Sequence, residues 1–328
     1  MTRRAAMCAA VLVAAAARCG AAETAVVKAG AVHTVKGDVL APGMILIVDG
    51  RIAEVGKEIP EPEGAAVYKA EVAVPGFIDA ASVIGVAPPR DEESCETTPR
   101  VRAADAFDAA APDVAAARMQ GITLARIGPG NRNVFGGMCA LVTTYGATAR
   151  DSIVRDEAAL KASLDPEAVR GNRSWDLTPP RSPFFRRPTT RMALVQMFTE
   201  TLERAKEARA GLRPATLDLE AIGRVPAGEL PLHVYTRTAF DLRALLDASA
   251  RAGVAPVIEG GIEVHRELGG IKARGLAVIL TPEAFGAVGA LSGAQVRASL
   301  PALLADSRFP SPWPPPASGS SPWTSAPW

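Results

Sequence analysis

Short alternating apolar runs dominate the chain between residues 24 and 74. Three of them, AVVKAGAVHTV, MILIVDGRIAEVG and AAVYKAEVAV, are separated by Gly and Pro. Alternation of apolar and polar positions is typical of strands, and the Asp-Gly pair at 49–50 is a strong hairpin signal. We therefore expect a small β unit over residues 23–74.

From Pro75 onward the pattern changes to strands that alternate with helices. Residues 121–128 and 136–144 are continuous apolar runs typical of buried strands, and residues 189–211 carry apolar positions at helical spacing up to a capping glycine. The runs LPLHVYT, APVIEGG and LAVIL then follow as strands with helices between them. Repeated strand–helix units predict a parallel sheet, and over this length they favour an α/β fold of the TIM-like (β/α) barrel type.

The end of the chain breaks this pattern. Residues 308–328 are rich in Pro, Ser and Trp and almost free of charge. Because proline removes ladder hydrogen bonds and breaks helices, no core can be built from this segment. A proline-rich interaction tail is one interpretation. A reading-frame shift that replaced the original C-terminus is the other, and we favour it, so that the barrel over residues 75–307 is expected to be incomplete at its C-terminal end.

Residues 1–22 have the features of a secretory signal peptide. A charged start at residues 3–4 precedes an apolar run over 5–17, which is too short to span a bilayer comfortably, and small residues follow. We expect an exported protein, periplasmic or extracellular, without membrane attachment after cleavage. The cleaved chain holds two cysteines, Cys95 and Cys139. An oxidising compartment permits a disulfide between them, but their spacing does not demand one.

Composition narrows the choice of partners. The 328 residues are 48% hydrophobic and 22% charged, with a net charge of +1. A charge so close to zero gives no electrostatic reason to expect binding to nucleic acid or to an anionic membrane. A small-molecule ligand remains as the expected partner, and the sequence does not fix the oligomeric state.

Five stretches of the barrel region follow a known pattern. They are VPGFIDAASVIG, MQGITLARIGPGNRNVFGGMCALVTTYG, RPTTRMALVQMF, LPLHVYTRTAFDL and APVIEGGIEVHRELGGIKARGLAVIL. In this order they resemble the metal-dependent amidohydrolase superfamily, in its imidazolonepropionase-like branch, from about Val26 to about Asp306. The resemblance implies a TIM-like barrel with a small β unit, zinc or another divalent metal, and hydrolysis of a non-peptide C–N bond such as that of a cyclic amide.

The same resemblance places metal ligands at the ends of the barrel strands. Two histidines in an H-x-H motif share one face of a strand and can hold one ion. In this chain those two positions are Ala81 and Val83, and the later ligand positions fall on Tyr235, Arg237 and Gly260. The final Asp of the family is expected where the Pro-rich tail begins. We therefore expect no metal cofactor, and weak or absent hydrolysis.

Four polar residues are candidates for a pocket: Asp79, Tyr235, Arg237 and Glu259. Glu259 ends a strand, where barrels of this kind carry their active sites. It could act as an acid or contact a ligand, but we favour an ion pair with Arg237 across neighbouring strand ends. The resemblance gives Asp79 the role of supporting its loop.

The three histidines, His33, His233 and His265, are too scattered in the sequence to rebuild a metal site. His233 lies in the middle of a strand, and we expect a structural role for it. Three functions stay open: a degenerate, weakly active or inactive hydrolase, a metal-free exported binding or scaffolding barrel, and a hydrolase with relocated ligands.

Overall fold

The computed structural model describes residues 23–35, 37–169, 186–281, 297 and 299–305. The chain divides into two compact units between Pro75 and Gly76. The expectations for residues 1–22 and 308–328 lie outside the described residues. Among those that are described, no helix combines the length and the apolar character that crossing a bilayer requires.

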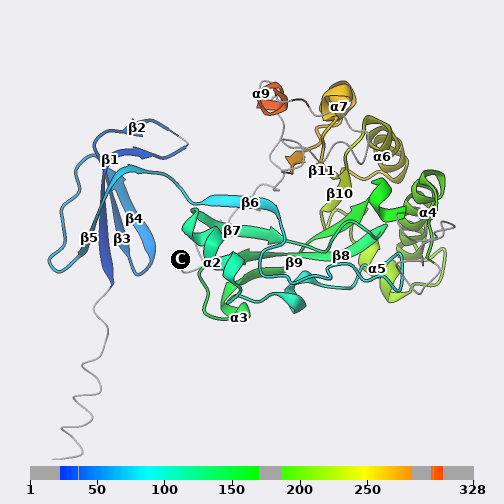
Figure 1. The fold of residues 1–328 in the computed structure, drawn as a ribbon, viewed down its shortest axis with the longest axis horizontal. Coiled ribbons are helices and arrows are strands. Elements are labelled where there is room, and N and C mark those ends of the chain that lie inside the picture. The colour runs from blue at the N-terminus through cyan, green and yellow to red at the C-terminus, as the bar shows by residue number, and fades with distance from the viewer. Residues whose placement is uncertain (1–22, 36, 170–185, 282–296, 298, 306–328) are drawn as a thin grey trace, which may run out of the picture. The chain divides into compact units, whose positions relative to one another are not determined.

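The first unit is a small β-sheet (Figure 1). Its strands are β1 (Thr24–His33), β2 (Val39–Leu40), β3 (Gly43–Val48), β4 (Arg51–Gly56) and β5 (Ala66–Ala73). Four strands follow the order β2-β1-β3-β4, and β5 pairs with β1.

The Asp-Gly hairpin predicted from the sequence is confirmed. It joins β3 to β4, with Val48 opposite Arg51. Asp49 and Gly50 have φ values of 51° and 72°. Positive φ at both central residues is the backbone of a type I′ turn, whose twist matches that of the flanking strands.

The second unit is built on a seven-stranded sheet with the order β12-β11-β10-β9-β8-β7-β6. Its strands are β6 (Phe77–Ser82), β7 (Ile122–Ile127), β8 (Phe135–Thr143), β9 (Ile153–Ser163), β10 (Leu232–Thr236), β11 (Val257–Gly260) and β12 (Val278–Leu280). Ala80 and Ala81 of β6 pack against Val257, Ala277 and Ile279 at the other end of the order, so the sheet is curled into a nearly closed, barrel-like form.

The expectation of an all-parallel sheet is wrong for one strand. The neighbours β9, β10, β11 and β12 are parallel, as are β6 and β7. The strand β8 is antiparallel to both β7 and β9. Its apolar run was correctly identified as a strand, but such a run carries no information on direction. The unit is therefore a mixed α/β fold rather than a regular (β/α) barrel.

Helices follow the strands of the second unit. They are η1 (Ala103–Ala106), α2 (Pro112–Met119), α3 (Ala149–Ser152), η2 (Pro166–Val169), α4 (Arg191–Arg209), α5 (Leu217–Gly223), α6 (Ala239–Ala252), η3 (Val264–Arg266), α7 (Leu268–Ala273) and α9 (Leu300–Ala305). Four begin at a threonine whose side chain accepts a backbone N–H of the first turn: Thr148, Thr190, Thr216 and Thr238. Such caps satisfy donors that would otherwise lack a partner.

The main core lies between the sheet and the helices α4 and α6. It joins Leu160 and Leu232 of the strands with Leu202 and Leu242 of the helices. Phe135 of β8 stacks on Phe198 of α4, with ring centroids 5.3 Å apart. This contact holds α4 on the sheet beside the strands whose side chains fill the interior.

The packing of α4 gives a first prediction. Replacing Phe198, which is fully buried, with alanine removes the stacked ring and leaves a cavity, so we expect a loss of about 3–5 kcal/mol in the free energy of unfolding. Phe240 is 58% exposed, and its replacement with alanine is the matched control, with an expected loss of about 1 kcal/mol or less. Urea unfolding followed by circular dichroism measures both. Equal losses in the two variants would contradict this description of the core.

Candidate functional site

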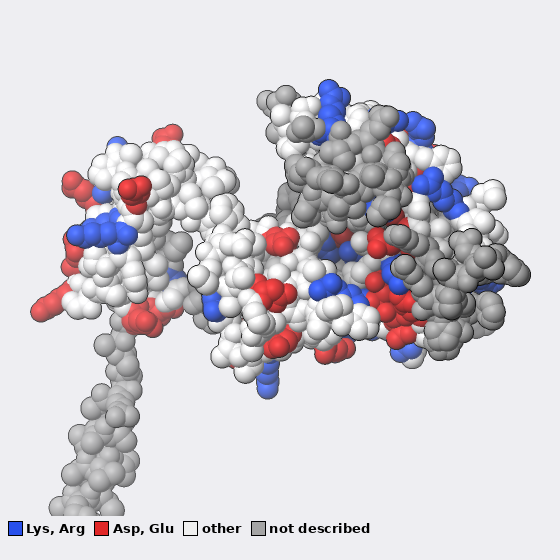
Figure 2. Space-filling model, in the orientation of Figure 1, with Lys and Arg blue, Asp and Glu red and all other residues white. Residues whose placement is uncertain are grey.

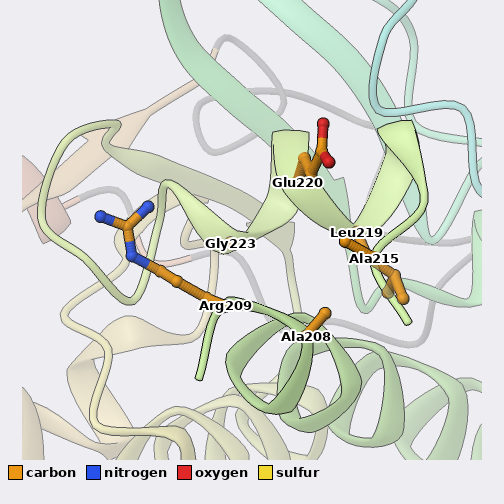
Figure 3. A pocket seen from close by; sticks show the side chains of 6 residues that line it. All are labelled: Ala208, Arg209, Ala215, Leu219, Glu220 and Gly223. Atoms are coloured by element: carbon orange, nitrogen blue, oxygen red, sulfur yellow. The ribbon is translucent and has the colours of Figure 1, made fainter. Parts of the chain in front are cut away.

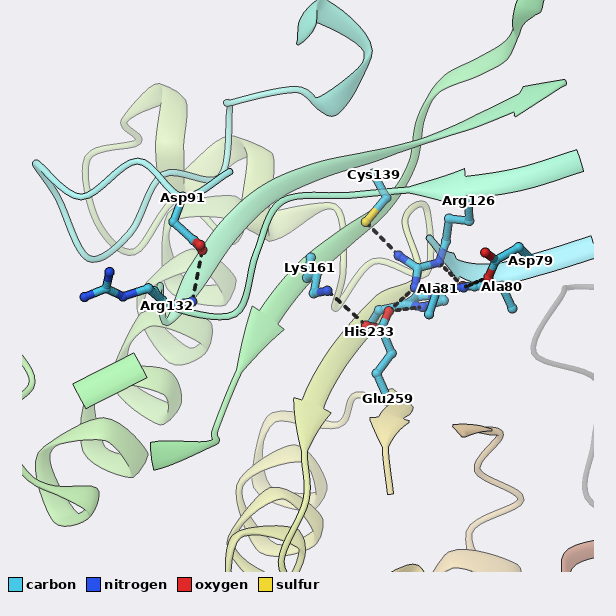
Figure 4. A network of polar contacts seen from close by, with 10 residues as sticks. All are labelled: Asp79, Ala80, Ala81, Asp91, Arg126, Arg132, Cys139, Lys161, His233 and Glu259. Carbon is cyan, nitrogen blue, oxygen red and sulfur yellow. Dashed lines mark hydrogen bonds and ion pairs between the residues drawn. The ribbon is translucent and has the colours of Figure 1, made fainter. Parts of the chain in front are cut away.

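Five polar side chains meet inside the curled sheet (Figure 4). They are Arg126 of β7, Cys139 of β8, Lys161 of β9, His233 of β10 and Glu259 of β11. Each comes from a different strand, and the five strands are consecutive in the sheet. The interior of the sheet is therefore polar at this level, although most of each strand is apolar.

The register of the strands explains why three of these side chains meet. Lys161 lies opposite His233, and Tyr235 lies opposite Glu259. Residues opposite each other in neighbouring strands point to the same face, as do residues two apart in one strand. Lys161, His233 and Glu259 are thereby brought to one face.

Glu259 is the centre of the cluster. Its Oε1 accepts a hydrogen bond from Nη2 of Arg126 and lies 3.1 Å from Nδ1 of His233. Its Oε2 lies 3.2 Å from Nζ of Lys161. The side chains of Glu259 and Arg126 are each only 1% exposed. Both carboxylate oxygens are thus held by cations in a site shielded from water.

Arg126 also connects the cluster to its surroundings. Its Nε donates to the backbone oxygen of Ala80 at 2.6 Å, and its Nη1 donates to Sγ of Cys139 at 2.9 Å. One guanidinium group therefore contacts β6, β8 and β11. A planar group with donors in fixed directions is suited to joining several partners in this way.

The charges set the protonation states within the cluster. Burial by itself raises the pKa of the Glu259 carboxyl, but Arg126, Lys161 and His233 outweigh burial and hold that pKa well below its usual range. Burial and the charge of Arg126 lower the pKa of His233. At neutral pH, Glu259 is therefore ionised and His233 is neutral, and His233 must carry its proton on Nδ1 to donate to Glu259. Burial raises the pKa of the Cys139 thiol, so it stays protonated.

Asp91 is a partly buried carboxyl group near the cluster that is influenced by the charge of Lys161. Burial raises the pKa of the Asp91 carboxyl, while a hydrogen bond from the backbone of Arg132 and the charge of Lys161 oppose that rise. The Arg132 N–H donates to Asp91 Oδ1 at 3.0 Å (Figure 4). Asp91 therefore lies within the electrostatic range of Lys161 but is held by the Arg132 backbone rather than by the cluster.

The expected ion pair between Glu259 and Arg237 is not formed. Arg237 binds Asp165 instead, with Nε 2.8 Å from Oδ2 and Nη2 2.5 Å from Oδ1. This bidentate bond, the largest influence on the arginine, raises the pKa of Arg237. The prediction was wrong because Arg237 follows the last residue of β10, where its side chain reaches the segment after β9 rather than β11.

Tyr235 lies between two cations rather than in an open pocket. The Lys161 ammonium is 5.9 Å from the centroid of its ring, and the Arg237 guanidinium is 5.7 Å from it. Both are within the range of cation–π attraction. Tyr235 therefore connects the Glu259 cluster to the Arg237–Asp165 pair.

Asp79 is not part of the cluster. Its Oδ1 accepts a hydrogen bond from the backbone N–H of Ala81 at 3.1 Å. This is a local contact between two residues of β6. Of the other expected ligand positions on this segment, Ala81 packs against β11 and β12, and Val83 is 41% exposed.

Gly260 has a backbone that admits no larger residue without strain. Its φ is +87°, and a Cβ added there would lie 3.0 Å from the backbone oxygen of Thr236 and from the ring of Tyr235. Positive φ of this kind favours glycine. A histidine at position 260 would therefore require a change in the local backbone and not only a different side chain.

The remaining histidines and the cysteines stay apart. His33 ends β1 in the first unit, and His265 lies in η3. Cys95 is exposed, Cys139 is buried, and both are free thiols, so the permitted disulfide is not formed.

Arg126 and Lys161 are the residues that sequence reasoning missed. Arg126 is the one cation of β7, ITLARI, and Lys161 is the one cation in the buried end of β9, AALKAS. A buried cation needs a partner, so a lone Arg or Lys in a run that reads as a buried strand was the available signal. The sequence did not show which carboxylate pairs with each of these two cations.

A divalent metal does not fit these residues. In the part of the chain that the structure describes, no three His, Cys, Asp or Glu side chains are grouped to hold an ion. Ala81, Val83 and Gly260 have no donor atoms in their side chains, and Arg237 is bound to Asp165. A metal site needs three or four ligands, and cations already hold both oxygens of Glu259.

Two hollows lie on the outer helices. One of about 100 Å³ lies between the end of α4 and α5, lined by Ala208, Arg209, Ala215, Leu219, Glu220 and Gly223 (Figure 3). Pockets for small molecules usually hold 300–1,000 Å³, so this one is too small for most metabolites. The other, of about 360 Å³, lies beside α4, where Arg204 pairs with Glu200 on the same helix. Neither hollow is lined by a residue of the Glu259 cluster.

The comparisons identify the fold. No protein-family model and no curated protein matches this chain. An amidohydrolase from Thermotoga maritima superposes with a TM-score of 0.69 at 22% identity, covering 78% of this chain and 70% of that one. At this identity the likeness shows the fold alone, and that fold is the one that the resemblance to the amidohydrolase superfamily implied.

Two further structures superpose less closely. An ochratoxinase from A. niger has a TM-score of 0.38 at 16% identity, covering 88% of this chain and 72% of that one. A Xaa-Pro dipeptidase has a TM-score of 0.40 at 13% identity, covering 83% and 70%. The fold assignment rests on the Thermotoga maritima structure.

The cluster predicts how Glu259→Gln changes stability. At neutral pH the variant leaves Arg126 without its buried counter-charge, and we expect a loss of about 3–5 kcal/mol in the free energy of unfolding. Since the folded pKa of Glu259 is depressed, its contribution is present above the unfolded pKa of about 4.3 and is lost as pH falls below it. The difference between wild type and variant should therefore shrink toward pH 3 in urea unfolding.

The exposed Glu200, which pairs with Arg204 on the surface of α4, provides the control. Glu200→Gln should change stability by less than about 1 kcal/mol over the same pH range. A Glu259→Gln variant as stable as the wild type, or one with a deficit independent of pH, would falsify the electrostatic description.

Proposed function

We propose that this protein is an amidohydrolase-like chain of hydrolase ancestry that works as a metal-free binding or scaffolding barrel. The fold is that of enzymes whose branch, by resemblance, cleaves cyclic amides and other non-peptide C–N bonds. The observation that carries the proposal is the state of Glu259, whose two oxygens are held by Arg126 and Lys161 in the sheet interior.

The chemistry of Glu259 supports this proposal. A general base needs a carboxylate whose pKa lies near the working pH, and tuned bases have raised values. The pKa of Glu259 is depressed instead, and the adjacent His233 is neutral and hydrogen-bonded to it. Glu259 therefore has a low proton affinity, and His233, although its Nε2 is free to accept a proton, has a lowered pKa and a side chain only 3% exposed, so neither is suited to activate water.

On the face formed by Tyr235, Arg237 and Glu259, a small ligand would contact Arg237, since Tyr235 and Glu259 are buried. Arg237 is the most exposed of the three, with a side chain 12% exposed. Its guanidinium is already oriented by Asp165, and a polar ligand that reaches it would meet a group fixed in position.

For the chain as a whole we also propose export, with cleavage near Ala22.

Metal analysis tests the proposed function. Purified protein dialysed against zinc and then against buffer should retain fewer than about 0.1 zinc ions per chain, because a stable site needs three or four ligands. Hydrolysis of a cyclic amide by the same sample should not exceed that of buffer, with or without added zinc. A chelator-treated sample is the control for adventitious metal.

The opposite result separates the alternatives. Retention of about one zinc ion per chain together with metal-dependent hydrolysis would establish a hydrolase with relocated ligands. Retention without hydrolysis would still contradict a metal-free barrel.

Mass spectrometry of the exported chain tests cleavage, which should remove the first 22 residues.

A further inference from the structure

The strand β5 lies at an edge of the small sheet of the first unit. It pairs in parallel with β1, from Ala25 opposite Ala66 to Val32 opposite Ala73. The other side of β1 pairs with β2 and β3 (Figure 1). Within the described residues, β5 has no second strand partner. Such an edge presents a row of backbone donors and acceptors that another strand can pair with.

Three large apolar side chains of this edge strand are exposed. Tyr68 is 61% exposed, Val72 is 55% exposed and Val67 is 45% exposed. Tyr68, Ala70 and Val72 share one face of the strand because side chains alternate. Exposed apolar residues gathered in one place on a surface mark a site of association. An eight-residue strand with this composition is unusual as a free edge, since natural edges are commonly short or interrupted.

We propose that β5 pairs antiparallel with β5 of a second copy of this chain, about a twofold axis at Ala70. The sequence of the strand, AVYKAEVA, is complementary to itself in this register. Tyr68 lies opposite the partner's Val72, which is a favourable aromatic–β-branched pair. Lys69 lies opposite the partner's Glu71, and the twofold axis repeats both contacts.

The two charges select this register against its neighbours. A slip of two residues in one direction sets Lys69 opposite Lys69, and a slip in the other direction sets Glu71 opposite Glu71. Like charges directly opposite each other are destabilising. A slip of one residue moves the partner's Val72 to the other face of the sheet, away from Tyr68. No ion pair within the described residues occupies Lys69 or Glu71, so both are available for this contact.

Charged residues on an edge strand often prevent association, and the arrangement here differs from that use. A single lysine near the centre of a strand faces its own copy in a symmetric pair and repels it. Lys69 and Glu71 lie one residue on either side of Ala70, so each faces the opposite charge.

Because the contact is one strand wide, it buries less surface than a permanent dimer needs. We therefore expect a dimer that dissociates on dilution.

Charge reversal in the full-length chain tests the pairing. Lys69→Glu and Glu71→Lys each turn two attractive cross-strand contacts into repulsive ones, and each should weaken dimerisation by about tenfold or more. The double variant Lys69→Glu/Glu71→Lys restores opposite charges and should recover the wild-type dimer. Sedimentation equilibrium over a series of concentrations measures the association. Lys57→Glu, at an exposed residue outside β5, is the matched control and should dimerise as the wild type does.

A cross-link at the axis tests the register. Opposite residues in an antiparallel pair have Cα atoms about 4.5–5.5 Å apart, within the range of a disulfide. Ala70→Cys, in a chain with Cys8, Cys19 and Cys95 changed to serine, should therefore form a disulfide-linked dimer on oxidation, whereas Lys57→Cys should not.

Three results would overturn the proposal. They are a wild-type chain that stays monomeric at every concentration, a double charge variant that associates as weakly as the single variants, and equal cross-linking through positions 57 and 70. Circular dichroism and urea midpoints equal to those of the wild type show that each variant is folded. These outcomes are independent of metal content and hydrolysis, so they do not bear on the proposed function.

Discussion

The buried contact between Arg126 and Glu259 organises the interior of the second unit. It connects β7 to β11, which are separated by three other strands in the sheet. The same guanidinium donates to Ala80 of β6, so one side chain joins one end of the curled sheet to β11, the strand next to its other end. A buried carboxylate without a counter-charge is too costly to persist, and the fold therefore requires that these strands stay together.

This arrangement also explains why the site is unlike that of a metal-dependent hydrolase. A divalent ion in a barrel is held by neutral or anionic donors from several strand ends. Here the strand ends supply cations, Arg126 and Lys161, to a single carboxylate at Glu259, and Gly260 holds a conformation that admits no ligand side chain. The positive charge in this site comes from Arg126 and Lys161. The Glu259 carboxylate, which could have been a metal ligand, neutralises these side chains instead.

The edge strands of the two sheets differ in what they contact. In the second unit, Ala80 and Ala81 of the edge strand β6 pack against the region of β11 and β12, so curvature brings the edges together. In the first unit, β5 has no second strand partner among the described residues, and its edge carries apolar side chains and two opposite charges. An edge can be protected by closing the sheet or by pairing it with another chain, and the amino acids of β5 suit the second solution.

The sequence by itself determined the local features and the general fold. Asp49 and Gly50 specify their hairpin, Gly211 follows the end of α4 at a positive φ, and Ala81 and Val83 show that a metal motif is missing, because each of these signals lies within a few neighbouring residues. Only the tertiary structure decided the partner of Glu259, which is Arg126, 133 residues away, rather than Arg237. It also decided the direction of β8. Both depend on which strands are neighbours in the sheet, and periodicity along one strand carries no information about that.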